Sequence, residues 1–167
     1  YHDHRNADID SYIDAIHLIV ERGGFVFRMG YRVAKPLDYK HPRVIDYATT
    51  ERTDFLDIFL ISQCRFVLGT TSGICDVAMI FDRPRVGINW VPFGLAPWGK
   101  HCLVVPKLLR YIETGELVDF AKAIAFNERR DSPWVWDGNY PRQLGIEYVD
   151  NNAEEITSAT QEMLDRL

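Results

Sequence analysis

Residues 64–84 constrain the fold of this chain more than any other stretch, because a strand pattern, a small-residue turn and a helix pattern follow one another directly. The apolar run at 66–68 predicts a short buried strand, and the amphipathic stretch from Ser72 to about Phe81 predicts a helix. Between them the turn carries only glycine, threonine and serine. A strand that feeds a helix through such a turn is the basic unit of an α/β fold.

This turn is suited to an anion, because its small side chains leave the first N–H groups of the helix open to approach. A helix N-terminus carries unpaired N–H donors and about half a positive charge, which favours phosphate. The simpler interpretation is a strand-to-helix connection in which Ser72 or Thr71 is the N-cap. The candidate phosphate-binding residues of the turn are Thr70, Thr71, Ser72 and Gly73.

Strand and helix patterns alternate from the start of the chain to Asn89. The predicted helices run from Asp8 to Gly23, from Thr53 to Ser62 and from Ser72 to about Phe81. The predicted strands are Phe25–Arg28, Arg43–Tyr47, 66–69 and Arg85–Asn89. Short apolar strands joined by helices imply a parallel sheet covered on both faces. We therefore expect these four strands to form one parallel sheet in a Rossmann-like three-layer α/β domain that takes in residues 1–167.

The pattern loosens beyond Trp90. Residues 103–105 predict an edge strand, residues 117–126 predict a helix, and about 130–141 read as an irregular loop. A terminal helix is predicted over 152–167, because Asn152 is followed three residues later by Glu155 in a capping box.

Composition limits the partners of the chain. A net charge of −5 gives no broad basic field, so no nucleic-acid partner is expected. No apolar run approaches the roughly 20 residues of a membrane span. The cysteines Cys64, Cys75 and Cys102 share no metal-ligand spacing, so reduced thiols in a cytoplasmic protein are expected.

Polar residues follow the predicted strands at their carboxyl ends, where open parallel sheets bind ligands. Arg28 and Gly30 follow the first strand, Asp46 the second, the 69–73 turn the third and Asn89 the fourth. The planar fork of an arginine matches the oxygens of a phosphate, so we expect Arg28 to lie within reach of the turn. Asp46 is interpreted either as an acid of the site or as a group that ties a loop.

No metal site and no catalytic residue are assigned. His2 and His4 are two residues apart, but at the start of the chain they are expected in a solvated tail. The serine of the turn lacks the Gly-x-Ser-x-Gly frame of a nucleophile elbow.

The segments RNADIDSYIDAI, GGFVFRMG, VIDYA, FLDIFLISQCRFVLGTTSG and PRVGINW, in this order, resemble a bacterial family of glycosyltransferases associated with surface-polysaccharide genes. The resemblance covers residues 1–89 and extends more loosely to the helix start at 154–156. A weaker similarity is to the donor-binding lobe of fucosyltransferase-like enzymes, in which a strand, a Thr/Ser-rich turn and a helix hold the diphosphate of a nucleotide sugar.

The resemblance implies a two-lobed GT-B architecture in which this chain is the carboxyl-terminal, donor-binding lobe and the amino-terminal lobe precedes Tyr1. The implied reaction transfers a sugar from a nucleotide-diphosphate sugar to a polysaccharide or glycoconjugate acceptor, without a metal or other cofactor. The implied donor- and phosphate-binding residues are Arg5, Asn6, Arg28, Gly30, Thr70, Thr71, Ser72, Gly73 and Asn89. Two alternatives stay open: a non-catalytic α/β domain that binds a phosphorylated ligand, and a nucleotide-sugar isomerase of the same fold.

Overall fold

A three-stranded parallel sheet runs through the computed structural model, which describes residues 3–50, 52–92, 99, 101–127 and 137–167. Its strands are β3 (Val67–Gly69), β4 (Arg85–Trp90) and β5 (Cys102–Pro106), in the order β3-β4-β5. Every residue of β4 is buried, as expected for the central strand of a covered parallel sheet. The edge strand predicted at 103–105 is confirmed as β5.

A second parallel pair consists of β1 (Val26–Phe27) and β2 (Val44–Ile45). The prediction of one sheet through all four strands is therefore wrong, although each predicted strand exists and each pairing is parallel. The two strands are only two residues long, and after them the Arg28 carbonyl accepts the N–H of Ala48 in a 3₁₀ turn, η3 (Tyr47–Thr49). The pair still packs against the same apolar core as the larger sheet.

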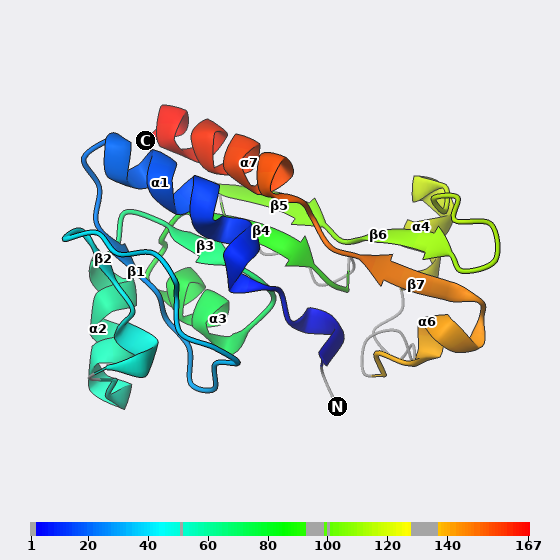
Figure 1. Ribbon diagram of the computed structural model, residues 1–167, viewed down its shortest axis with the longest axis horizontal. Helices are drawn as coiled ribbons and strands as arrows, with labels where there is room; N and C mark the ends of the chain where they lie inside the picture. Colours follow the sequence, from blue (N-terminus) through cyan, green and yellow to red (C-terminus); the bar gives the residue numbers. More distant parts are fainter. Residues whose placement is uncertain (1–2, 51, 93–98, 100, 128–136) are drawn as a thin grey trace.

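Helices lie on both sides of the three-stranded sheet (Figure 1). On one side α1 (Ile13–Glu21) lies beside α7 (Ala153–Arg166), which contacts β4 and β5. On the other side α3 (Gly73–Ile80) contacts β3 and α2 (Asp54–Gln63). The main core lies between the sheet and the first helix pair; its buried members are Tyr12, Ala15, Ile16, Leu37, Val86, Ile88, Ile156, Ala159 and Met163.

The helix starts follow the sequence signals. Asp8 caps a 3₁₀ turn, η2 (Ile9–Tyr12), that leads into α1, and Thr53 caps α2 by accepting the N–H of Leu56 at 3.2 Å. The capping box of Asn152 and Glu155 is present at the start of α7. Among the described residues no helix is both long enough and apolar enough to span a membrane.

An antiparallel pair that the sequence analysis did not predict lies beyond the parallel sheet (Figure 1). It consists of β6 (Leu108–Tyr111) and β7 (Ile146–Val149), and its apolar residues pack with α4 (Phe120–Asn127). The helix predicted from 117 begins three residues later, because Leu117 instead forms a bridge with Arg110. Within the predicted irregular loop, α6 (Tyr140–Gln143) is helical, and residues 128–136 lie outside the described residues.

The architecture is thus mixed α/β with parallel sheets, which is compatible with a Rossmann-like domain.

Candidate functional site

The turn between β3 and α3 lies at the carboxyl edge of the parallel sheet and is open. Ser72 occupies the N-cap position with the extended backbone of an N-cap, but its side chain makes no capping hydrogen bond. Apart from its chain neighbours and the backbone of its own helix, a Cβ atom built on Gly73 or on Gly69 would have no heavy atom within 4 Å. Gly73 therefore places no side chain over the first turn of α3, in which the Cys75 N–H already donates to the Ser72 carbonyl at 3.0 Å.

Hydrogen bonds to Val91 and Cys75 hold the backbone of this turn in place. The Thr71 hydroxyl donates to the Val91 carbonyl at 2.7 Å and accepts the Val91 N–H at 3.3 Å. The Cys75 thiol donates to the Thr70 carbonyl at 3.1 Å, and burial raises the pKa of this thiol. Val91 uses the only proton of the Thr71 hydroxyl, and the Ser72 hydroxyl donates to the Cys75 thiol at 3.9 Å, so the hydroxyl donor left for an anion in this turn belongs to Thr70.

At the end of β4, Asn89 is completely buried and has a left-handed backbone with φ of 52°. Its N–H donates to the Asn151 side-chain oxygen at 2.7 Å, and its own side-chain oxygen accepts the Asn151 N–H at 2.6 Å. The Asn151 amide also donates to the Pro106 carbonyl at 3.1 Å. One side chain thus ties the ends of β4 and β5 to the connection between β7 and α7.

Lys107 follows β5 directly, and its side chain is only 4% exposed. Its ammonium donates to the Asn6 carbonyl at 2.9 Å and lies 2.6 Å from the Asp150 carboxylate. The amino-terminal segment is therefore held at the carboxyl end of β5. A buried ammonium needs such partners, because removing it from water is costly.

The residues before Asn6 are also held in place. His4 is buried, and its ring stacks on Tyr148 of β7 with centroids 5.9 Å apart. The prediction that His4 lies in a solvated tail is therefore wrong; His2 lies outside the described residues. Arg5 belongs to a 3₁₀ turn, η1 (Asp3–Arg5), and its charge partly opposes the burial that raises the pKa of Tyr148.

These contacts join into one path, which we call the edge network; its residues are Asn6, Lys107, Asp150, Asn151, Asn89, Val91 and Thr71. Three of the predicted site residues belong to it: Asn6, Asn89 and Thr71. The sequence analysis missed Lys107, Asp150 and Asn151. Lys107 had a usable signal, since it directly follows the apolar run of a predicted strand, whereas β7 was not recognised as a strand.

Tyr12 lies beside the edge network. Burial raises the pKa of its phenol to about 12; the nearby Asn89 amide opposes this effect, and the charge of Asp150 adds to it. The phenol consequently stays neutral at any physiological pH.

Arg28 and Asp46 follow the carboxyl ends of β1 and β2 and bind each other. The Arg28 guanidinium donates to the Asp46 carboxylate and to the Lys35 carbonyl, each at 3.0 Å. Asp46 also accepts hydrogen bonds from the Leu37 N–H at 3.0 Å and from the Thr49 hydroxyl at 2.7 Å. These bonds hold the loop, which agrees with the second of the two interpretations given for Asp46.

Burial raises the pKa of Asp46, but these hydrogen bonds and the Arg28 charge outweigh it, so the pKa is lowered overall. The polar contacts of Arg28 with described residues do not include the 70–73 turn. Gly30, two residues on, has a φ of 155°, and a Cβ there would approach Val33 to 2.8 Å. Glycine is therefore required at this position by the loop itself.

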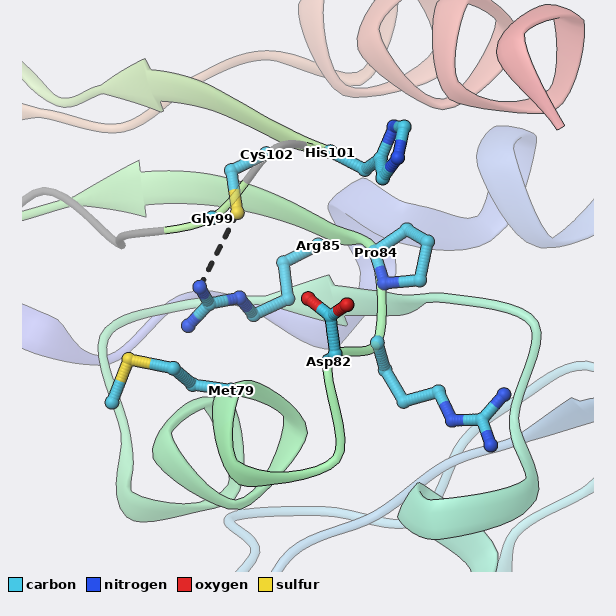
Figure 2. A pocket seen from close by; sticks show the side chains of 8 residues that line it. Met79, Asp82, Pro84, Arg85, Gly99, His101 and Cys102 are labelled. Atoms are coloured by element: carbon cyan, nitrogen blue, oxygen red, sulfur yellow. Dashed lines mark hydrogen bonds between the residues drawn. The ribbon is translucent and has the colours of Figure 1, made fainter.

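A cavity of about 240 Å³ lies at the opposite, amino edge of the sheet (Figure 2). Arg85 begins β4 and Cys102 begins β5, and between them the guanidinium donates to the thiol at 3.3 Å. None of the predicted site residues lines this cavity.

In the described parts of the chain, no group of three histidine, cysteine, aspartate or glutamate side chains is placed to hold a metal ion. Comparison of the chain with protein-family models, with curated proteins and with solved structures found no match.

Proposed function

We propose that this chain is the donor-binding lobe of a nucleotide-sugar glycosyltransferase, with the donor diphosphate at the N-terminus of α3. The observation that carries the proposal is the open start of α3. Side chains cap the starts of α2 and α7, through Thr53 and Asn152, whereas Ser72 leaves its helix uncapped and Gly73 faces open space. Unpaired N–H groups after a parallel strand are a favourable place for a diphosphate.

The chemistry of sugar transfer fits such a site. When the bond from sugar to diphosphate breaks, negative charge develops on the leaving diphosphate, and fixed donors directed at it stabilise the transition state. In this proposal the donors are the first N–H groups of α3 with the Thr70 hydroxyl, and the Ser72 hydroxyl joins them when it turns from the Cys75 thiol to the phosphate. Thr71 holds the turn in place through Val91.

The remaining parts of the proposal follow from the resemblance. A second lobe, as in the GT-B architecture, would supply the acceptor site and the catalytic base. Arg28 would add positive charge from the end of β1, where Asp46 and Lys35 now hold it. Cys64, Cys75 and Cys102 form no disulfide with one another, as is usual in the cytosol, where this proposal places the chain.

The test is calorimetric titration of uridine, guanosine and adenosine diphosphates, and of their sugars, into wild type and Gly73→Val. A branched side chain at Gly73 would occupy the space that the phosphate needs, so we expect affinity to fall at least about tenfold, or 1.4 kcal/mol. Stability should hardly change, because no heavy atom lies within 4 Å of the new Cβ.

The matched control is Ala153→Val, which places the same side chain at the first position of α7, whose N-terminus is capped. It should leave affinity unchanged. Equal affinities for wild type and Gly73→Val would reduce the turn to a structural connection. Binding of the free diphosphates with no gain from any attached sugar would favour the non-catalytic phosphate-binding alternative.

A further inference from the structure

The end of β4 departs from regular strand geometry at one residue. The pairing with β5 shifts register between Ile88 and Trp90, so that Asn89 lies in an irregularity of the ladder. Its φ of 52° belongs to the left-handed region, which non-glycine residues seldom adopt, although asparagine tolerates it better than most. Such a conformation persists only where the surroundings hold it.

The group that holds it is Asn151. The two residues exchange two hydrogen bonds, of 2.7 and 2.6 Å, between the backbone N–H of each and the side-chain oxygen of the other. Both residues are buried, so loss of either side chain would leave unpaired polar groups away from water. The backbone path at the end of β4 therefore depends on a residue more than sixty positions later.

That path determines where Val91 lies. Two residues after Asn89, both backbone polar groups of Val91 bond to the hydroxyl of Thr71. Thr71 is the central residue of the turn that opens α3. The contacts thus run without a gap from Asn151 through Asn89 and Val91 to the turn.

We propose that Asn151 is a positioning residue for the 70–73 turn, acting through Asn89 and Val91. Asn151 directly precedes the N-cap of α7 and the turn directly precedes α3, so the starts of the two helices are coupled across the sheet. The importance of this coupling for ligand binding rests on the proposed function. The coupling itself is a property of the chain without ligand.

Two neighbouring asparagines provide a matched test by amide hydrogen exchange of the full chain, without ligand. Asn151→Ala should speed exchange of the Val91 and Cys75 amides about tenfold or more, because these amides donate to Thr71 and Ser72 and the turn loses its support. Asn152→Ala removes the cap of α7 and should speed exchange only in the first turn of α7. Equal changes at the Val91 and Cys75 amides in both variants, or none in Asn151→Ala, would overturn the proposal.

The opposite end of the path gives a second measurement in case Asn151→Ala does not fold. Thr71→Val should speed exchange of the Asn89 and Val91 amides about tenfold or more, and Thr71→Ser, which keeps the hydroxyl, should not. Unchanged exchange at Asn89 in Thr71→Val would contradict the coupling.

Titration of the tightest-binding nucleoside diphosphate then separates the two proposals. Asn151→Ala should weaken binding about tenfold, and Asn152→Ala should not. If wild type binds none of the diphosphates, the proposed function fails while the exchange data still decide the coupling. If wild type binds and the exchange of the Val91 and Cys75 amides does not respond to Asn151→Ala, the coupling alone fails.

Discussion

The ammonium of Lys107 lies 2.6 Å from the carboxylate of Asp150, but only the lysine side chain is buried, whereas the aspartate side chain is 50% exposed. The two partners of this ion pair therefore depend on it to different degrees. Without Lys107 the carboxylate can be hydrated, but without Asp150 the Asn6 carbonyl is the one partner that the described residues leave to the ammonium.

We expect Asp150→Asn to lower the free energy of unfolding by about 2 kcal/mol, since it leaves a buried charge without its counter-charge. Lys107→Met should cost less, about 1 kcal/mol, because an apolar side chain suits the buried position. Urea unfolding of both variants measures the difference. A larger loss for Lys107→Met would show that the ammonium is not desolvated in this way.

Loss of the N-cap hydroxyl should lower the stability of the protein at the start of α2 but hardly at the start of α3. Thr53→Ala removes a capping hydrogen bond and should cost about 1 kcal/mol of stability. The sequence alone predicts a similar cost for Ser72→Ala, but the structure gives Ser72 no such bond, so we expect a change within about 0.3 kcal/mol. Thermal unfolding of both variants tests this, and equal losses would mean that Ser72 caps α3 in solution.

Asp46 should make stability depend on acid pH. Its pKa in the folded protein is below the ordinary value of 3.8, so its contribution is complete above pH 3.8 and is lost as the pH falls through the lower folded value. Asp46→Asn should therefore be less stable than wild type at pH 7, and the gap should narrow below pH 3.8. Unfolding at pH 7, 5 and 3 measures the gap, and a constant gap would exclude this linkage.

Tyr12 should make the stability of the protein depend on alkaline pH. Its pKa is raised from 10.0 to about 12 in the folded chain, so the folded state holds the phenolic proton more tightly than the unfolded state. This contribution is complete below pH 10 and is lost as the pH rises toward 12. Tyr12→Phe should thus show a shallower loss of stability between pH 9 and 11 than wild type. Parallel curves would mean that the phenol reaches water.

The sequence predicted the parallel strands and the helices between them better than it predicted how these strands pair into sheets. The strand, turn and helix at 66–81 carry their signal locally, in apolar runs and small residues, and all three appear in the structure. The split between the β1-β2 pair and the larger sheet depends on how two short strands pair over long sequence separations, and no local pattern encodes that.

For the candidate site, the sequence predicted individual residues but not the partners that they contact. Asn89 was identified from its place at a strand end, but its partner Asn151 follows β7, a strand that was not predicted. Arg28 was expected within reach of the turn; the structure pairs it with Asp46 at the end of the neighbouring strand, and its reach to the turn stays a prediction. Partners from distant parts of the chain can be named only once the fold brings them together.

The antiparallel pair has a consequence for how the chain could be shortened. Tyr111 at the end of β6 pairs with Ile146 at the start of β7, so the chain leaves and re-enters the same place. A tight hairpin at this point would preserve the path from Lys107 through both strands to α7, but it would remove Val118 and Ala123, which pack on the buried Leu109 and Ile146. A shortened chain would therefore need new apolar cover for Leu109 and Ile146 if the edge network and the turn before α3 are to stay in place.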